Sequence, residues 1–289
     1  MNQPLHHFMY YRILLCCLLL GFPARNSISA QESELLKPWV IPETDEHGPI
    51  QFGILLPPSY EDHSQAFPVI YYMHGMNQYY LAPRAQWIAS FFIEQFTEEQ
   101  FPECIMVFID GGEGWWMDHY DGDPMLETEI VNYLIPHVDQ NFRTLPSKRL
   151  TMGYSMGGNG AVFFYTKHPE LFSAAISLDG GIVTYDDYLY RTGGRADIIS
   201  DEDYFFEYGS PYGWVKRNRE ALINKADTSI LLTAGYIIDA NKEFLSVLED
   251  ESIPVKFVEL GYDHEFGYVF SQSQKDLLMF LSKRLNPAE

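Results

Sequence analysis

The sequence predicts an α/β protein with a mostly parallel central sheet and helices on both faces. Short apolar segments of β type, such as residues 68–73 and 104–109, have the composition of strands that are buried on both faces. These segments alternate along the chain with helical patterns. The length of 289 residues and the hydrophobic content of 46% suit one domain of this class.

The first thirty residues are expected to lie outside that domain. Arg12 precedes an apolar run, residues 13–22, that is too short to span a bilayer as a helix, and the segment ends at Ala30. We therefore predict a signal peptide, residues 1–30, and a single domain, residues 31–289, that is secreted or periplasmic with no stable membrane insertion after cleavage. An uncleaved membrane anchor is the alternative, because Ile28 is a poor residue three positions before the cleavage site.

The cysteine content and the net charge exclude a disulfide within the exported chain and disfavour nucleic acid as a class of partner. Without the signal peptide, Cys104 is the only cysteine, which excludes an internal disulfide. The formal net charge of −21 repels the phosphate backbone, so nucleic acid is not an expected partner.

The expected strands are read from their apolar patterns. Residues 49–58 alternate well enough for an edge strand before a turn, and they follow a polar stretch at 31–48. The later runs are continuously apolar, as strands covered on both faces are. Besides the run that leads into Gly153, we expect strands at residues 49–58, 68–73, 104–109, 172–178, 229–234 and 255–260.

The expected helices place apolar residues on one side. In residues 128–139 the stripe consists of Ile130, Leu134, Ile135 and Val138. By the same criterion we expect helices at residues 83–95, 161–167, 241–249 and 273–284. Residues 182–228 are charged and aromatic without a clean period, and are predicted to form a lid-like insertion over one end of the sheet.

The pattern Gly-x-Ser-x-Gly at residues 153–157 joins a short apolar run to a helical segment, which is the context of a nucleophile elbow. Ser155 is the predicted nucleophile, and the two glycines remove side chains that would collide at the turn. The N–H of Met156, at the start of the helix, is the first predicted oxyanion donor. A glycine-rich turn with an incidental serine is the alternative.

A serine nucleophile requires a base, and the base requires a carboxylate. In this type of sheet the acid and then the histidine follow the serine. His264 lies in a loop after the last strand and is the predicted base; the alternative is a surface histidine. Asp239 is the predicted acid, unless it caps the next helix, and Asp179 is its rival because it also follows a strand. Asp263, beside His264, is expected to point elsewhere.

The second oxyanion donor is expected in the loop after the strand at 68–73. In His74-Gly75-Met76, the glycine allows the N–H of Met76 to approach a reacting carbonyl oxygen. We expect His74 to anchor this loop.

Four segments together resemble the Putative esterase family of α/β hydrolases, which includes esterase D, feruloyl esterases and the mycolyltransferase antigen 85 proteins. The similarity covers most of residues 50–285 and implies the α/β-hydrolase fold, a triad of Ser155, His264 and Asp239, and oxyanion donors at Met76 and Met156. The family usually has its acid at the position where this chain has Ile238. Asp179 therefore remains the alternative to Asp239 as the acid of the triad. The four segments are residues 74–75, 134–143, 153–158 and 261–264.

The loop after the strand at 104–109 resembles the aromatic-rich loop that lines the family's substrate cleft. Trp115, Trp116 and His119 are therefore predicted to bind substrate, with core packing as the alternative. The acidic residues near 118–123 lack the calcium-loop pattern, and we expect neither a metal nor a cofactor.

The resemblance implies a serine esterase that hydrolyses carboxylic esters through an acyl-enzyme, and the predicted signal peptide implies that this esterase is secreted. Export favours feruloyl or acetyl esters on polysaccharide over a glutathione thioester, so the expected partner is a small-molecule or polysaccharide-linked ester. Two alternatives remain: an acyltransferase that passes the acyl group to a sugar hydroxyl, and a non-catalytic carbohydrate-binding protein.

Overall fold

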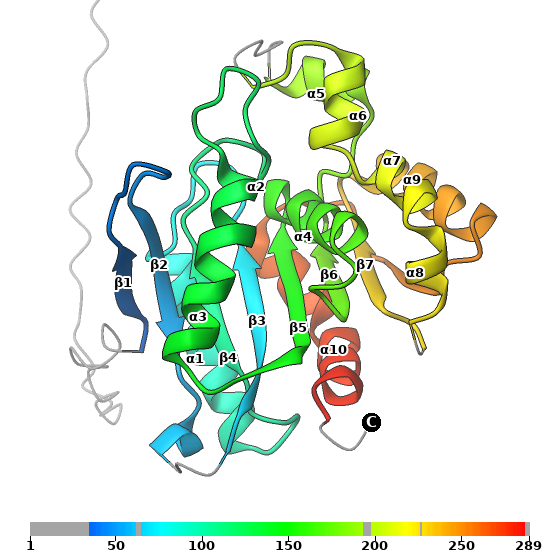
Figure 1. Ribbon diagram of the computed structural model, residues 1–289. Helices are drawn as coiled ribbons and strands as arrows, with labels where there is room; N and C mark the ends of the chain where they lie inside the picture. Colours follow the sequence, from blue (N-terminus) through cyan, green and yellow to red (C-terminus); the bar gives the residue numbers. More distant parts are fainter. Residues whose placement is uncertain (1–34, 62–64, 193–197, 226, 287–289) are drawn as a thin grey trace, which may run out of the picture.

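One eight-stranded sheet runs through the protein in the order β1-β2-β4-β3-β5-β6-β7-β8. Strands β3 to β8 pair with one another in parallel, while β2 is antiparallel to both β1 and β4. The computed structural model (Figure 1) describes residues 35–61, 65–192, 198–225 and 227–286, so the predicted signal peptide lies outside the described residues. The strands are β1 (Lys37–Ile41), β2 (Ile50–Leu55), β3 (Phe67–Met73), β4 (Ile105–Ile109), β5 (Thr144–Tyr154), β6 (Ala174–Leu178), β7 (Ile230–Ala234) and β8 (Val255–Glu259).

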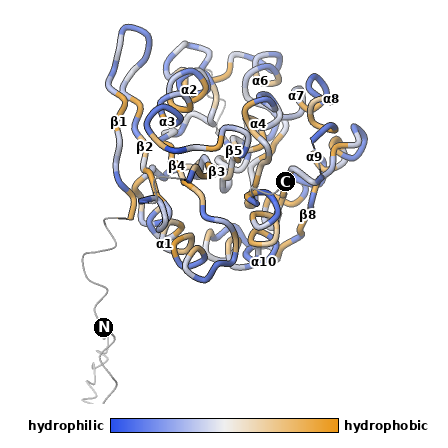
Figure 2. Tube along the Cα trace, turned by 60° about the horizontal axis from the view of Figure 1, so that its bottom comes forward, coloured by the Kyte–Doolittle hydropathy of each residue, from blue (hydrophilic) through white to orange (hydrophobic). Residues whose placement is uncertain are grey.

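Helices cover both faces of this sheet, as the sequence predicts (Figure 2). The helices are α1 (Pro83–Thr97), α2 (Leu126–Glu129), α3 (Ile135–Asn141), α4 (Met156–Lys167), α5 (Tyr185–Thr192), α6 (Glu202–Tyr208), α7 (Pro211–Arg217), α8 (Arg219–Ile223), α9 (Ile238–Asp250) and α10 (Phe266–Leu285). A short 3-10 helix, η2, spans Pro58–Glu61, and a π-helical turn, η3 (Ile130–Leu134), joins α2 to α3. One hydrophobic cluster packs α1 and α10 against the sheet, and the other packs the α2-to-α3 segment, α4, α7 and α9 on the opposite face.

The central strands are buried along their whole length. Every residue of β3, β4, β6 and β7 is buried, which explains why these segments are apolar without alternation. Their expected positions are confirmed to within a few residues. Within the described ranges, no helix has both the length and the apolar character needed to cross a bilayer.

Residues 49–58 contain a strand, β2, as predicted, but the prediction that this strand lies at the edge of the sheet is wrong. The edge is β1, which lies in the stretch that reads as polar and pairs with β2 from Lys37↔Ile54 to Ile41↔Ile50. Four of its five residues are exposed, so no buried face imposes an alternating pattern. Pro38 fits such an outer strand, since proline cannot donate to a second neighbour.

The described parts of the segment at 182–228 contain four short helices, α5 to α8, and these helices lie in different places. Helices α5 and α6 lie beyond the carboxyl ends of the parallel strands, at the top of Figure 1. Helix α7 instead packs against α4 and α9 on one face of the sheet, where Val215 is fully buried. Short helices of about two turns carry too few residues to show a clear apolar period.

Candidate active site

Ser155 stands at a sharp turn between β5 and α4. Its backbone has φ 55° and ψ −120°, an uncommon conformation for a residue with a side chain. The turn is possible because its neighbours are glycines: a Cβ added to Gly153 would lie 2.0 Å from the carbonyl oxygen of Gly157. A Cβ added to Gly157 would lie 2.0 Å from the carbonyl oxygen of Met73. The geometry is that of a nucleophile elbow, as the sequence predicts.

His264 reaches Ser155 from the loop between β8 and α10. Its Nε2 lies 2.9 Å from the Ser155 Oγ, across 109 positions of sequence. The Tyr154 ring stacks on the imidazole, with centroids 5.1 Å apart at 26°, and the Tyr154 hydroxyl donates a hydrogen bond to the His264 carbonyl oxygen. Burial raises the pKa of Tyr154 to about 12, so this hydroxyl keeps its proton. The loop that carries His264 is therefore tied to the residue that precedes the serine.

The carboxylate beside His264 belongs to Asp179, not to Asp239. His264 Nδ1 lies 2.6 Å from the Asp179 Oδ2. Asp179 directly follows β6 and is fully buried. The expectation that Asp239 would contact this histidine is wrong, and the rival residue occupies the place.

The loop after β7, residues 235–237, supplies backbone donors in place of a carboxylate. The N–H groups of Gly235 and Ile237 donate to the Asp179 Oδ1 over 2.9 and 3.2 Å, and the N–H of Tyr236 donates to Oδ2 over 3.3 Å. An ionised carboxylate only accepts hydrogen bonds, so it suits a site formed by donors alone.

Asp239 has a different role because α9 begins at once after that loop. The helix starts at Ile238, which places Asp239 in its first turn with an exposed side chain. A carboxylate there interacts favourably with the positive end of the helix dipole. Asp263 points elsewhere, as expected, and accepts a hydrogen bond from the N–H of Glu265 over 2.8 Å.

The two predicted oxyanion donors lie at the same pocket as Ser155. Met156 is the first residue of α4, so its N–H has no acceptor within the helix. Met76 lines the pocket from the loop after β3. His74 anchors that loop: its Nε2 accepts from the Gly111 N–H over 3.1 Å, which leaves Nδ1 to donate to the Gly75 carbonyl oxygen over 2.9 Å. The role of the two N–H groups stays a prediction.

The pocket at Ser155 has a volume of about 410 Å³. Of the three predicted substrate residues, only Trp115 lies on it, held edge-on against Tyr188 with ring centroids 5.2 Å apart. The lining consists of Met76, Gln78, Arg84, Trp115, Tyr154, Ser155, Met156, Gly181, Arg191, Tyr236, Ile237 and His264.

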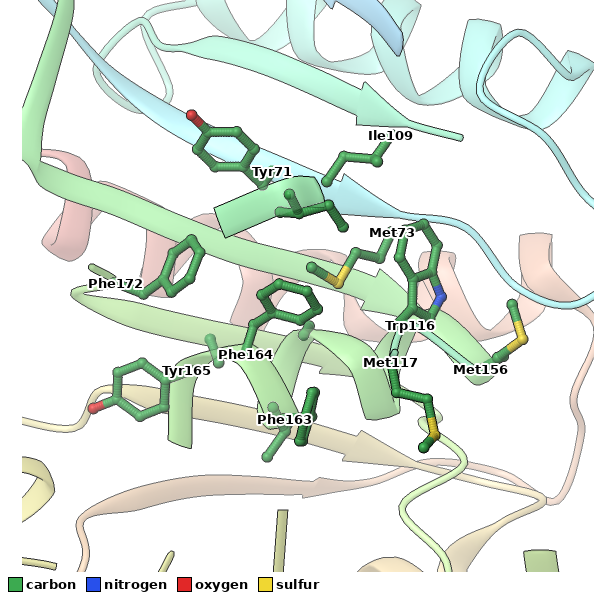
Figure 3. Packing of buried hydrophobic residues seen from close by; sticks show 14 of the residues in the cluster. Tyr71, Met73, Ile109, Trp116, Met117, Met156, Phe163, Phe164, Tyr165 and Phe172 are labelled. Atoms are coloured by element: carbon green, nitrogen blue, oxygen red, sulfur yellow. The ribbon is translucent and has the colours of Figure 1, made fainter. Parts of the chain in front are cut away.

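Trp116 is a core residue, and its predicted contact with substrate is wrong. The side chain is fully buried, its Nε1 donates to the His74 carbonyl oxygen over 3.2 Å, and it lies among buried residues that include Met73 and Met156 (Figure 3). Trp115 and Trp116 both have positive φ, and the turn they form sends the two rings in different directions.

His119 is also misplaced by the sequence prediction. It is 6% exposed and lines a second pocket, between the start of β2 and the loop at 111–114, not the pocket at Ser155. Its backbone N–H donates to the Pro124 carbonyl oxygen over 3.0 Å, which closes a turn over residues 119–124.

The sequence interpretation missed Tyr154, Arg84 and Tyr236 as residues of the pocket. The sequence did contain a reason to consider Arg84. It lies in the first turn of a helix, where a positive charge is unfavourable next to the positive end of the helix dipole, and this suggests a role other than stabilising the helix. Among the described residues, no three His, Cys, Asp or Glu side chains form a group that could hold a metal ion.

Comparisons of the sequence with known proteins give matches to esterases. The family model described as Putative esterase matches residues 46–216. Esterase Rv1288 of Mycobacterium tuberculosis H37Rv is 29% identical over 212 residues, which are 69% of this chain and 45% of that protein. The uncharacterized protein YbbA of Bacillus subtilis is 26% identical over 179 residues, 52% of this chain and 62% of that protein. The chain thus spans less than half the length of the curated esterase it matches.

Solved structures share the fold at low sequence identity. A ferulic acid esterase has a TM-score of 0.70 at 18% identity, covering 87% of this chain and 98% of that one. The fluorophosphonate-binding serine hydrolase FphF of Staphylococcus aureus has a TM-score of 0.70 at 15% identity, covering 86% and 98%. MPT51 of Mycobacterium tuberculosis has a TM-score of 0.67 at 13% identity, covering 87% and 99%. The expected α/β-hydrolase fold is confirmed. Since the matched region is more than half of the chain and contains both Ser155 and Asp179, the protein belongs to the Putative esterase family.

Proposed function

We propose that this protein is a serine esterase that hydrolyses carboxylic esters through an acyl-enzyme. The observation that carries the proposal is the continuous hydrogen-bonded chain from the Ser155 Oγ through His264 to the buried Asp179, with separations of 2.9 and 2.6 Å. A hydroxyl, an imidazole and a carboxylate in this order form the arrangement that activates a serine.

In the proposed reaction, Asp179 holds the Nδ1 proton of His264, so that the Nε2 lone pair faces the Ser155 hydroxyl. His264 takes the hydroxyl proton as Ser155 attacks the ester carbonyl carbon, and the N–H groups of Met76 and Met156 stabilise the oxyanion. His264 then gives the proton to the leaving alcohol. Water, activated by the same imidazole, releases the acid from the acyl-enzyme and restores the serine.

For the substrate we propose feruloyl or acetyl esters, including those on polysaccharide. Support comes from the aromatic and apolar lining of the pocket, which includes Trp115, Tyr154 and Tyr236, and from the structural similarity to a ferulic acid esterase. We propose that the enzyme acts outside the cytoplasm, on the ground of the predicted signal peptide at residues 1–30.

The proposal is tested with p-nitrophenyl acetate and with a fluorophosphonate probe that labels activated serines. The wild type should hydrolyse the ester and take up the probe at Ser155, as read by mass spectrometry. Ser155→Ala and His264→Ala should lower kcat by a factor of about 1,000 or more.

Matched controls are Ser271→Ala, which removes an exposed hydroxyl on α10, and His168→Ala, which removes a histidine bound to Glu127. Neither should affect the chemical step. An inert wild type, or activity that survives Ser155→Ala, would contradict the proposed function.

A further inference from the structure

The pocket at Ser155 contains cations but no carboxylate in its lining. Acidic residues outnumber basic ones by 40 to 19 in the sequence, yet the lining includes two arginines, Arg84 and Arg191, and neither Asp nor Glu. Two guanidinium groups in the lining attract an anion locally, against the negative charge of the whole molecule. The lining therefore offers a place for a negative group of a substrate.

Arg84 is held in place by aromatic rings. Its guanidinium carbon lies 4.6 Å from the ring centroid of Phe266 and 4.9 Å from that of Tyr154. Stacking of this kind restricts the side chain while leaving the N–H edge of the guanidinium available. Arg84 is half-buried, and its position is set before any ligand arrives.

In the part of the chain that the structure describes, no carboxylate lies within ion-pair distance of Arg84 and no acceptor takes a hydrogen bond from it. Glu265 is close enough for Arg84 to contribute to lowering its pKa, after the larger effect of backbone N–H groups. That carboxylate is occupied at the start of α10, where it accepts the Tyr268 N–H over 2.9 Å. A half-buried guanidinium without an acceptor leaves its strongest hydrogen-bonding capacity to a ligand.

Arg84 also lies on a defined side of the reaction. The leaving alcohol receives its proton from His264, so the alcohol part of the ester lies on the histidine side of Ser155. Arg84 rests on Phe266, two residues after His264, and on Tyr154, whose ring stacks on the His264 imidazole. These contacts place the guanidinium beside the histidine, which is the side expected for the alcohol.

We propose that the preferred substrate is an ester whose alcohol part carries a carboxylate, which Arg84 binds through its guanidinium. This inference rests on the esterase function proposed above. The fork of N–H donors on arginine matches the two oxygens of a carboxylate. Acyl esters of uronic acids are carbohydrates of this class, and acyl esters of hydroxybenzoic acids are aromatic ones.

The test compares two acetyl esters, para-acetoxybenzoate and its neutral methyl ester, as substrates of the full chain and of Arg84→Met. Methionine keeps an apolar stem against the rings, so the fold should survive, and thermal unfolding checks this. Loss of the guanidinium should lower kcat/KM for the anionic ester about tenfold relative to the neutral one. Arg219→Met, which removes an arginine paired with Glu251 outside the pocket, should leave the ratio unchanged.

Two outcomes would overturn the inference. The first is an unchanged ratio in Arg84→Met. The second is a larger effect of Arg84→Met on mono-p-nitrophenyl succinate, relative to p-nitrophenyl butyrate, because the carboxylate would then belong to the acyl part.

The proposed function and the inference fail in different ways. Hydrolysis of p-nitrophenyl acetate with no effect of Arg84→Met on the charge preference would leave the function standing and refute the inference. If no ester is hydrolysed, the function fails and the ester part of the inference fails with it; binding of para-hydroxybenzoate to Ser155→Ala, followed by tryptophan fluorescence, then decides whether Arg84 binds a carboxylate. Tighter binding of this anion than of its methyl ester, lost on adding Arg84→Met, would support it, and equal binding would refute it.

Discussion

Replacing Asp179 with asparagine tests which carboxylate orients His264. The candidates are the buried Asp179 and the exposed Asp239, which the sequence analysis favoured. The Asp179 carboxylate accepts four hydrogen bonds: Oδ1 accepts the Gly235 and Ile237 N–H groups, and Oδ2 accepts the Tyr236 N–H and the His264 Nδ1–H. An asparagine can keep only one oxygen. With its oxygen at the Oδ1 position, its NH₂ group would face two donors.

The magnitude follows from those contacts. His264 would have to accept at Nδ1, which moves its proton to Nε2 and removes the lone pair that faces Ser155. The wrong tautomer should lower kcat by a factor of about 10,000. The Tyr236 N–H loses its acceptor, and because this contact is only partly buried, the loss should lower the free energy of unfolding by about 1 kcal/mol.

The assay is p-nitrophenyl acetate hydrolysis together with urea unfolding, and Asp239→Asn is the matched control. Asp239 is exposed in the first turn of α9, so its replacement should cost about 0.3–1 kcal/mol of stability and leave kcat near the wild-type value. The reasoning would be refuted if folded Asp179→Asn kept more than about a tenth of the wild-type kcat, or if Asp239→Asn did the greater damage.

Three further predictions concern packing and burial. Trp116→Ala should lower the free energy of unfolding by about 3–5 kcal/mol and leave the KM of the folded protein near the wild-type value, since the ring is fully buried and does not line the pocket. Trp115 is also in the core, at 5% exposed, but it lines the pocket, so Trp115→Ala should raise KM as well; equal effects on KM would contradict the assignment of Trp116 to the core alone. The Tyr72 hydroxyl is buried and has no hydrogen-bond partner within the described ranges, and burial raises the pKa of this tyrosine above 10.0. Above pH 10 the unfolded chain releases that proton while the folded chain keeps it, so the free energy of unfolding falls as the pH rises above 10. Tyr72→Phe should therefore flatten the alkaline loss of stability in urea melts and raise stability at pH 7 by about 1 kcal/mol, and a steeper alkaline loss would oppose this account. Gly157→Ala should destabilise the protein by about 3 kcal/mol or more, because its Cβ would lie 2.0 Å from a backbone oxygen, whereas Gly48→Ala, with its nearest atom at 4.0 Å, should be tolerated; comparable melting temperatures would exclude the steric explanation.

The sequence predicted those parts of the fold in which burial or a tight turn restricts which residues can occur. The runs that became β3 and β4 are apolar because both faces of each strand are covered, and the elbow around Ser155 needs glycines at fixed spacing. The outer strand β1 escaped detection because an exposed strand has no buried face to impose a pattern.

The identity of the acid depends on contacts that sequence order does not contain. Strands β6 and β7 are neighbours, so a carboxylate after either one lies near the His264 loop. What decides between them is how early α9 begins, a difference of a few residues. The orientation of Trp115 and Trp116 likewise depends on two positive φ angles, which no periodicity in the loop reveals.

The loop at 235–237 holds Asp179 through main-chain atoms alone, and this affects how the sequence of the pocket can vary. The N–H of Tyr236 contacts the carboxylate, while its side chain is 48% exposed and lines the pocket. At position 236, the N–H that contacts Asp179 is present in every residue except proline, whereas the side chain that lines the pocket can be replaced. Mutations at 236 can alter which esters enter while the proton-transfer machinery stays intact, so substrate range and chemistry can evolve separately in this protein.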